Sequence, residues 1–176
     1  MYKSEETMSP QKENEDFYSL FLQEKPRKIL VYLKKENKQL YIAMISKNVN
    51  ATYAHTFNVL KRLEKLNLVS FKESGRIKLV KLTELGEEVA KVILNLMDLL
   101  KLGKMENELT KVYESEIKGK LREQMDKEQI AKQINRLKTE IIELSKDNQL
   151  NVVVTAKKLL KRMDDILAEV FGFPPG

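Results

Sequence analysis

The feature that most constrains the fold is the segment from Asn48 to Gly86, NVNATYAHTFNVLKRLEKLNLVSFKESGRIKLVKLTELG. Residues 51–66 repeat apolar side chains with the period of an α-helix, which predicts an amphipathic helix. Two short runs with alternating apolar side chains follow, and the sequence ESG between them is typical of a turn. A β-hairpin is therefore expected directly after the helix. The buried face of helix 51–66 is predicted to carry Thr56, Val59, Leu60 and Leu63, with Tyr53 and Phe57 beside them.

Helical patterns also precede and follow this segment. Pro26 suits the first turn of a helix, which is expected to bury Ile29, Leu30, Tyr32 and Leu33. Residues 42–47 predict a second, short helix, and NVN after it predicts a turn with Val49 buried. Asn50 is the predicted N-cap of helix 51–66. Thr83 is expected to cap the helix that follows the hairpin.

The hairpin strands each offer an apolar side. Val69 and Phe71 share one side of the first strand. In the second strand, Ile77 and Leu79 are predicted to face inward, because they alternate with Arg76 and Lys78. Gly75 at the turn can adopt a positive φ.

The predicted order is helix, short helix, turn, helix, hairpin, helix, which is the winged helix-turn-helix arrangement. The sequence resembles the winged helix of MarR- and ArsR-like transcription regulators, particularly archaeal ones, over about residues 25–100. The matching residues are Leu63-Glu64, Leu68-Val69, Gly75-Arg76 and the motif LTELG at 82–86. Asn67 stands where the family often has Gly, and Asn tolerates the left-handed conformation. The expected fold class is mainly α with a small β-hairpin.

Charge is concentrated in the same part of the chain. Residues 25–82 hold 14 cationic and three acidic side chains, a net charge of +11, whereas the whole chain carries +6. Residues 1–24 carry −4 and residues 83–176 carry −1. A cationic block of this kind is the electrostatic footprint of a phosphate-binding surface.

The resemblance implies that helix 51–66 enters the major groove of duplex DNA and that the wing, residues 70–79, contacts the backbone or minor groove. Asn58 can pair with adenine, and Arg62 can pair with guanine or phosphate. Ala51, His55, Asn58 and Arg62 are predicted to share the face opposite the core. Alternatives stay open for Tyr53, whose helical phase also fits the core, and for His55, which could be pH-sensitive or simply exposed. The predicted DNA-binding residues are Ser46, Lys47, Ala51, Thr52, Tyr53, His55, Asn58, Lys61, Arg62, Lys72, Ser74, Arg76 and Lys78.

After Gly86 the chain is predicted to be helical almost to its end. Apolar residues repeat at spacings of three and four in two coiled-coil-like seams, and the register breaks near Gly119 and Asp126. A last helix is expected over residues 152–171. The seams either form the core of one chain, join two chains or dock another protein, and a homodimer is the favoured interpretation. The predicted dimerisation residues are Leu96, Leu99, Leu102, Met105, Leu109, Val112, Ile130, Ile134, Leu137 and Ile141.

Three regions are predicted. Residues 1–24 form an acidic N-terminal segment in which Ser9 and Pro10 can begin a short helix. Residues 25–102 form the winged helix-turn-helix domain, and residues 103–176 form a helical dimerisation or interaction region.

Several classes of protein fit this sequence poorly. The chain has no cysteine, and His55 is its only histidine, so neither a disulfide nor a histidine–cysteine metal site is expected. GxGxxG, P-loop, GxSxG and HExxH motifs are absent from the sequence, and we expect neither an enzyme nor a cofactor. No signal peptide or membrane span is predicted, so the expected location is the cytoplasm, at the nucleoid.

These features predict a homodimeric transcription regulator that binds duplex DNA sequence-specifically. Two alternatives remain: an architectural protein that binds DNA with little sequence preference, and a winged helix that binds another protein. The net charge of +11 in residues 25–82 favours DNA over a protein partner. Nothing in the sequence identifies an effector.

Overall fold

The computed structural model describes residues 20, 23–74, 77–146 and 149–173. The chain divides into two compact units, Met1–Leu94 and Asn95–Gly176. The division lies inside helix α5 (Glu84–Val112), as does the boundary that the sequence predicted between residues 102 and 103. The predicted short helix beginning at Ser9 and Pro10 lies outside the described residues.

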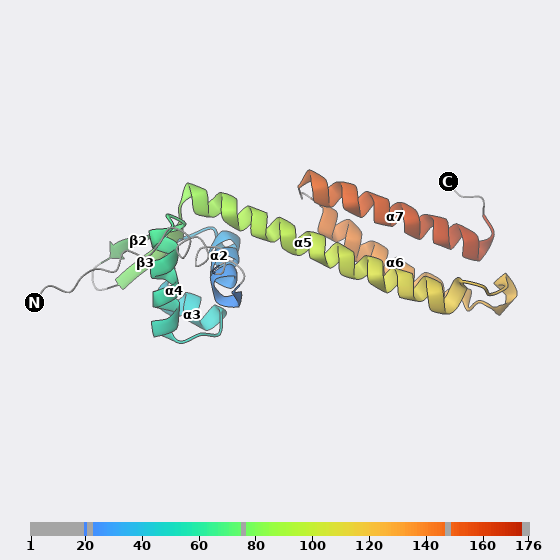
Figure 1. The fold of residues 1–176 in the computed structure, drawn as a ribbon, viewed down its shortest axis with the longest axis horizontal. Coiled ribbons are helices and arrows are strands. Elements are labelled where there is room, and N and C mark those ends of the chain that lie inside the picture. Colours follow the sequence, from blue (N-terminus) through green and yellow to red (C-terminus); the bar gives the residue numbers. More distant parts are fainter. Residues whose placement is uncertain (1–19, 21–22, 75–76, 147–148, 174–176) are drawn as a thin grey trace, which may run out of the picture. The chain divides into compact units, whose positions relative to one another are not determined.

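The first unit contains the predicted order of elements (Figure 1). Helices α2 (Glu24–Glu36), α3 (Ile42–Asn48) and α4 (Tyr53–Lys65) precede a hairpin of β2 (Val69–Ser74) and β3 (Ile77–Leu82), after which α5 begins. This arrangement confirms the winged helix-turn-helix and the mainly α fold class.

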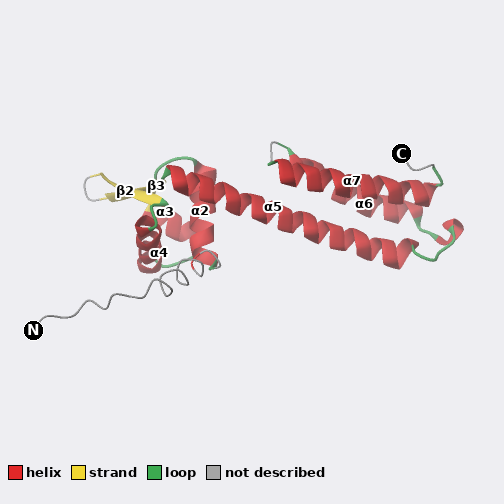
Figure 2. Ribbon diagram, turned by 45° about the horizontal axis from the view of Figure 1, so that its top comes forward, coloured by secondary structure: helices red, strands yellow, loops and turns green. Residues whose placement is uncertain are grey.

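A third strand completes the wing sheet. β1 (Leu40–Tyr41) pairs antiparallel with β3, giving the strand order β1-β3-β2. Figure 2 shows the strands of the wing in yellow and the helices in red. The sequence predicted only two strands, because two residues are too few to show the alternation that marks a strand. Leu40 opposite Val80 anchors the start of α3 to the sheet.

The core of the first unit lies between α2, α3, α4 and the sheet. The predicted inward side of α4 is confirmed, since Thr56, Val59, Leu60 and Leu63 are all buried. Val49 is also buried, as its position between two polar residues in the turn predicted. The other fully buried large side chains of this core are Leu20, Ile29, Leu30, Leu33, Leu40, Ile42 and Ile45.

The inward side of β3 differs from the prediction. Val69 lies opposite Leu82, and Phe71 lies opposite Val80, so Val80 and Leu82 face the core. Leu79, which was predicted to face inward with Ile77, is only partly buried. The run IKLVKL has apolar residues in both alternating phases, and the pairing with β2 selects one of them.

The start of α4 also differs. The predicted N-cap, Asn50, instead adopts a left-handed conformation with φ 51°. Thr52 is the N-cap, and its Oγ1 accepts a hydrogen bond from the His55 backbone N at 3.2 Å. The turn after α3 therefore extends two residues further than the sequence indicated.

The LTELG motif joins the hairpin to the turn before it. Thr83 N donates to the Leu68 carbonyl oxygen at 3.1 Å, and Thr83 Oγ1 donates to the Asn67 carbonyl oxygen at 2.5 Å. Gly86 N in turn donates to Thr83 Oγ1 at 3.0 Å. A Cβ on Gly86 would lie 1.9 Å from the Leu68 carbonyl oxygen, so only glycine fits here.

The second unit is helical. After α5, the chain forms a π-helical turn (Tyr113–Ile117) and a 3-10 turn (Arg122–Gln124) before α6 (Lys127–Ser145) and α7 (Leu150–Phe171). The predicted breaks near Gly119 and Asp126 are confirmed. Helices α6 and α7 lie side by side (Figure 1). Their buried residues meet those of α5 in one core: Leu102, Leu109, Ile117, Ile130, Ile134, Leu137, Ile141, Val152, Ala156, Leu159, Met163, Ile166 and Val170.

The predicted dimerisation seams lie mostly inside this core, where residues of the same chain cover them. Leu99 and Met105 pack partly against the core, and Leu96 is 55% exposed. Periodicity reveals that a helix face is covered, but it does not reveal which helix covers it. Here α7 of the same chain contributes the covering residues. The seam residues that are buried are Leu102, Leu109, Val112, Ile130, Ile134, Leu137 and Ile141.

None of the helices is both long and apolar enough to cross a membrane within the part of the chain that the structure describes. Within the same residues, no three His, Cys, Asp or Glu side chains come together in a way that could hold a metal ion.

Gly86→Ala is expected to destabilise the first unit by about 3 kcal/mol, because the new methyl group must displace the Leu68 backbone. Denaturant unfolding followed by circular dichroism measures this loss. Gly103→Ala is the matched control on the same helix, since a Cβ there meets nothing within 4 Å. It should stabilise the chain by about 1 kcal/mol through helix propensity. Unchanged stability of Gly86→Ala would contradict the contact.

A threonine-to-valine substitution should have opposite effects on the free energy of unfolding at two positions near the start of α4. Thr56 is fully buried, and its Oγ1 has no hydrogen-bond partner among the described residues. Thr56→Val should therefore raise the free energy of unfolding by about 1 kcal/mol. Thr52→Val removes the N-cap and should lower it by about 1 kcal/mol. Thermal unfolding of both variants tests the pair, and a loss of stability in Thr56→Val would contradict the assignment.

Candidate nucleic-acid interface

The face of α4 that is turned away from the core carries Ala54, Asn58, Lys61 and Lys65. Ala54, Asn58 and Lys65 are exposed, and Lys61 is half-buried. The spacing of four, three and four residues places these side chains in one row along the helix. This row combines an amide that can read a base edge with two cations.

The outward face predicted from the sequence lies at a different position around the helix. The sequence predicted Ala51, His55, Asn58 and Arg62, of which only Asn58 belongs to the row. Ala51 precedes α4 and packs partly against the core, whereas Arg62 is half-buried and His55 is exposed on one flank. The observed row is rotated from the predicted one toward the wing. Ala54 and Lys65 were not among the predicted site residues, although the positions of the buried residues indicated this face.

The other flank of α4, toward the wing, is aromatic. Tyr53 is 56% exposed, so the alternative that it belongs to the core is wrong. Phe57, one turn later, is half-buried and lies 6.2 Å from Phe71 of β2 between ring centroids. The two ring planes are tilted by 56° relative to each other. This pair fixes α4 against the wing.

Two lysines lie over this aromatic pair. Lys61 Nζ is 4.8 Å from the Phe71 centroid and 5.8 Å from the Phe57 centroid, and Lys78 Nζ is 6.0 Å from the Phe57 centroid. Lys61 also forms an ion pair with Glu64 at 2.8 Å. These contacts hold two ammonium groups at the junction of α4 and β3.

The wing adds further cations. Lys72 of β2 is exposed, and Lys78 of β3 lies opposite Glu73, with 3.8 Å between the charged groups. Lys81 is also exposed and was not among the predicted site residues. Ser74 ends β2, paired with Ile77. Arg76, the predicted wing-tip contact, lies outside the described residues.

Residues near the helix-turn-helix turn take different positions. Ser46 is buried, and its Oγ donates to the Ala43 carbonyl oxygen at 2.9 Å, so it does not lie on the surface as predicted. Its place on the inner side of a short amphipathic helix is the reason. Lys47 and Thr52 are exposed. Lys25 of α2, which sequence analysis did not select, donates to the carbonyl oxygens of Val49 and Asn50 at 2.8 and 3.1 Å.

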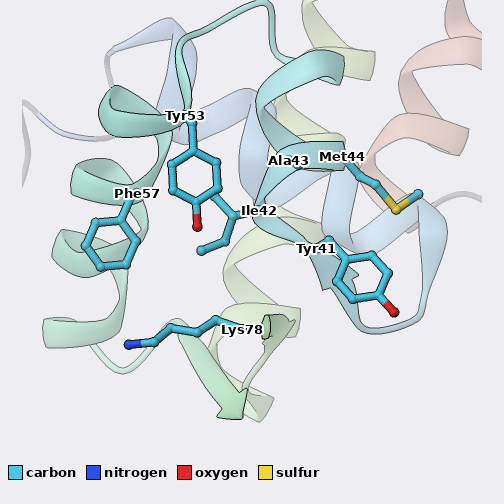
Figure 3. Close-up of a pocket in the computed structure, with 7 residues that line it drawn as sticks. All are labelled: Tyr41, Ile42, Ala43, Met44, Tyr53, Phe57 and Lys78. Atoms are coloured by element: carbon cyan, nitrogen blue, oxygen red, sulfur yellow. The ribbon is translucent and has the colours of Figure 1, made fainter. Parts of the chain in front are cut away.

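A groove of about 630 Å³ lies beside this surface (Figure 3). Tyr53 and Phe57 of α4 stand on one side, and Tyr41 and Met44 stand on the other. Sequence analysis selected only two of its residues, Tyr53 and Lys78, because the short β1–α3 segment carries no periodic signal that marks it as a site. The lining residues are Tyr41, Ile42, Ala43, Met44, Tyr53, Phe57 and Lys78.

Comparison with known proteins gives one similar sequence and several similar structures. No family model matches the chain. It is 27% identical to an uncharacterised protein of Archaeoglobus fulgidus over 84 residues, which are 46% of this chain and 88% of that protein. The crystal structure of AF1382 from Archaeoglobus fulgidus is also 27% identical, covers 47% of this chain and 93% of its own, and has a TM-score of 0.44.

Two further solved structures are similar at lower identity. The S. aureus MepR–DNA complex is 23% identical over 60% of this chain and 89% of its own, with a TM-score of 0.45. ZitR of Lactococcus lactis is 22% identical over 76% of this chain and 98% of its own, with a TM-score of 0.42.

Proposed function

We propose that this protein is a transcription regulator that binds duplex DNA through the exposed row of α4 and through the wing. The observation that carries the proposal is the row of Ala54, Asn58, Lys61 and Lys65 beside the wing lysines. This surface belongs to the segment 25–82 with its net charge of +11. A convex helix fits into the concave major groove, and the cations beside it are opposite in charge to the phosphates along the groove.

Each part of the row has a distinct role. Asn58 can donate to and accept from adenine in the major groove, so it supplies preference for a base. Ala54 is small enough for close approach and can contact a thymine methyl group. Lys61 and Lys65 neutralise phosphates, which gives affinity without sequence preference.

The wing and the turn extend the contact to the flanking backbone. Lys72, Lys78 and Lys81 lie on the two hairpin strands, and Lys47 lies in the last turn of α3. The aromatic contacts of Lys61 and Lys78 hold their side chains before DNA arrives, which lowers the conformational entropy lost on binding. Lys25 supports the surface indirectly, because it ties α2 to the turn that precedes α4.

We also propose that the regulator acts as a homodimer, because a two-fold dimer places two recognition helices on two half-sites. Most of the predicted seam residues are buried in the core of the second unit, but Leu96 is exposed. In the second unit, Leu96 and Leu100 on α5 are 55% and 61% exposed and lie one helical turn apart. Burying them against the same residues of a second copy removes apolar surface from water.

Asn58→Ala should reduce the preference for the best duplex over a random duplex about tenfold, because it removes the base-reading amide. Lys65→Ala should instead weaken binding to all duplexes and lower the slope of log K against log salt by about one. Fluorescence anisotropy with a duplex pool and with the protein's own upstream region, at several salt concentrations, measures both.

Lys132→Ala, an exposed lysine on α6, is the control and should change neither quantity. Steep salt dependence with no preferred sequence would assign the protein an architectural role. Absence of binding at low salt would refute DNA binding and leave a winged helix that binds another protein.

The wild type should have a mass of about twice 20.5 kDa by light scattering after size exclusion. The double variant Leu96→Lys, Leu100→Lys should be monomeric, because it places charges in the proposed contact. Leu121→Lys, which changes a residue that is 66% exposed outside α5, should remain dimeric. A dimeric double variant would refute this interface, and a monomeric wild type would refute the homodimer.

A further inference from the structure

The groove in Figure 3 exposes aromatic surface that the core does not use. Tyr53 is 56% exposed, Tyr41 is 44% exposed and Met44 is 43% exposed. The three residues come from separate elements, since Tyr41 ends β1, Met44 lies in α3 and Tyr53 begins α4. These side chains offer apolar and aromatic surface to a ligand that enters the groove.

The groove has two walls, a floor and one charge. Tyr53 and Phe57 form one wall, and Tyr41 and Met44 form the other. Ile42, which is only 2% exposed, lies between the walls and forms the floor. Lys78 is the charged lining residue, and the lining among the described residues includes no Asp or Glu. A flat aromatic ring with a negative charge beside it could contact both the rings and Lys78, whose ammonium also lies 3.8 Å from the Glu73 carboxylate.

We propose that this groove binds an unpaired nucleobase of DNA, stacked on Tyr53 and Phe57, with its phosphate near Lys78. Every base offers a flat π-face, so stacking on tyrosine and phenylalanine tolerates any sequence. The volume of about 630 Å³ lies within the range of small-molecule sites and accommodates one nucleotide.

Paired DNA cannot use this groove, because the base faces are hidden in the stack of the duplex. The exposed rings therefore add a capacity that the Asn58 row does not have. The groove adjoins the row on α4, because Phe57 directly precedes Asn58 and lies about 100° from it around the helix. A base released by a bulge, a mismatch or local melting would then have a partner.

The proposal that the base comes from DNA rests on the proposed duplex binding. The proposal that the groove stacks a base does not depend on duplex binding. The two are separated experimentally, because duplex preference depends on Asn58 and base stacking depends on Tyr53.

The test compares two fluorescent single strands of equal length and charge, oligothymidine and a fully abasic strand, by anisotropy at fixed salt. The wild type should bind oligothymidine about tenfold more tightly than the abasic strand. Tyr53→Ala should abolish this difference, and Tyr53→Phe should retain it, because phenylalanine keeps the stacking ring. Since Tyr53 is largely exposed, circular dichroism should show that both variants remain folded.

Two controls separate stacking from charge. Lys65→Ala, which lies outside the groove lining, should weaken binding to both strands equally. Lys132→Ala, which changes an exposed lysine on α6, should leave the affinity for both strands unchanged.

Equal affinity of the wild type for the two strands would overturn the proposal, as would an equal loss on both strands in Tyr53→Ala. Tighter binding of oligouridine than of oligothymidine would overturn the choice of DNA over RNA. Loss of duplex preference in Asn58→Ala with retained discrimination between the two single strands would support both functions independently.

Discussion

Burial of one face of α4 is the constraint on which the rest of the first unit depends. Val59, Leu60 and Leu63 pack into the core, and each such side chain contributes about 1.5–3 kcal/mol when fully buried. Because a helix has a fixed period, burying this face determines which side chains point outward. The row with Asn58 and the aromatic flank with Tyr53 are therefore both consequences of one packing choice.

The junction between β3 and α5 fixes the position of the wing relative to α4. Thr83 bonds to Asn67 and Leu68, and Gly86 allows α5 to begin against the Leu68 backbone. The end of α4, the end of β3 and the start of α5 are thereby held at one point. With the wing fixed there, Phe71 meets Phe57, and Lys61 and Lys78 lie over the two rings. The motif that suggested the family from sequence is thus a structural joint, and the candidate DNA contacts are arranged around it.

Two surfaces with different chemistry meet on α4. The row of Ala54, Asn58, Lys61 and Lys65 offers an amide and charges to base edges and phosphates. The groove beside it offers ring faces, which only an unpaired base can contact. Phe57 contributes to the groove and also supports Lys61. Duplex binding and base stacking are therefore proposed for adjoining parts of one surface, and each has its own diagnostic residue.

The sequence by itself determined the order of the helices and the hairpin, the buried face of α4 and the cationic character of residues 25–82, because these follow from local periodicity and composition. Tertiary structure decided what periodicity leaves ambiguous. Pairing with β2 selected Val80 over Leu79, and α7 covered seams that a second chain could equally have covered. The groove between β1, α3 and α4 also required tertiary structure, because its walls come from segments whose separation in space is set by the core and not by their own sequences.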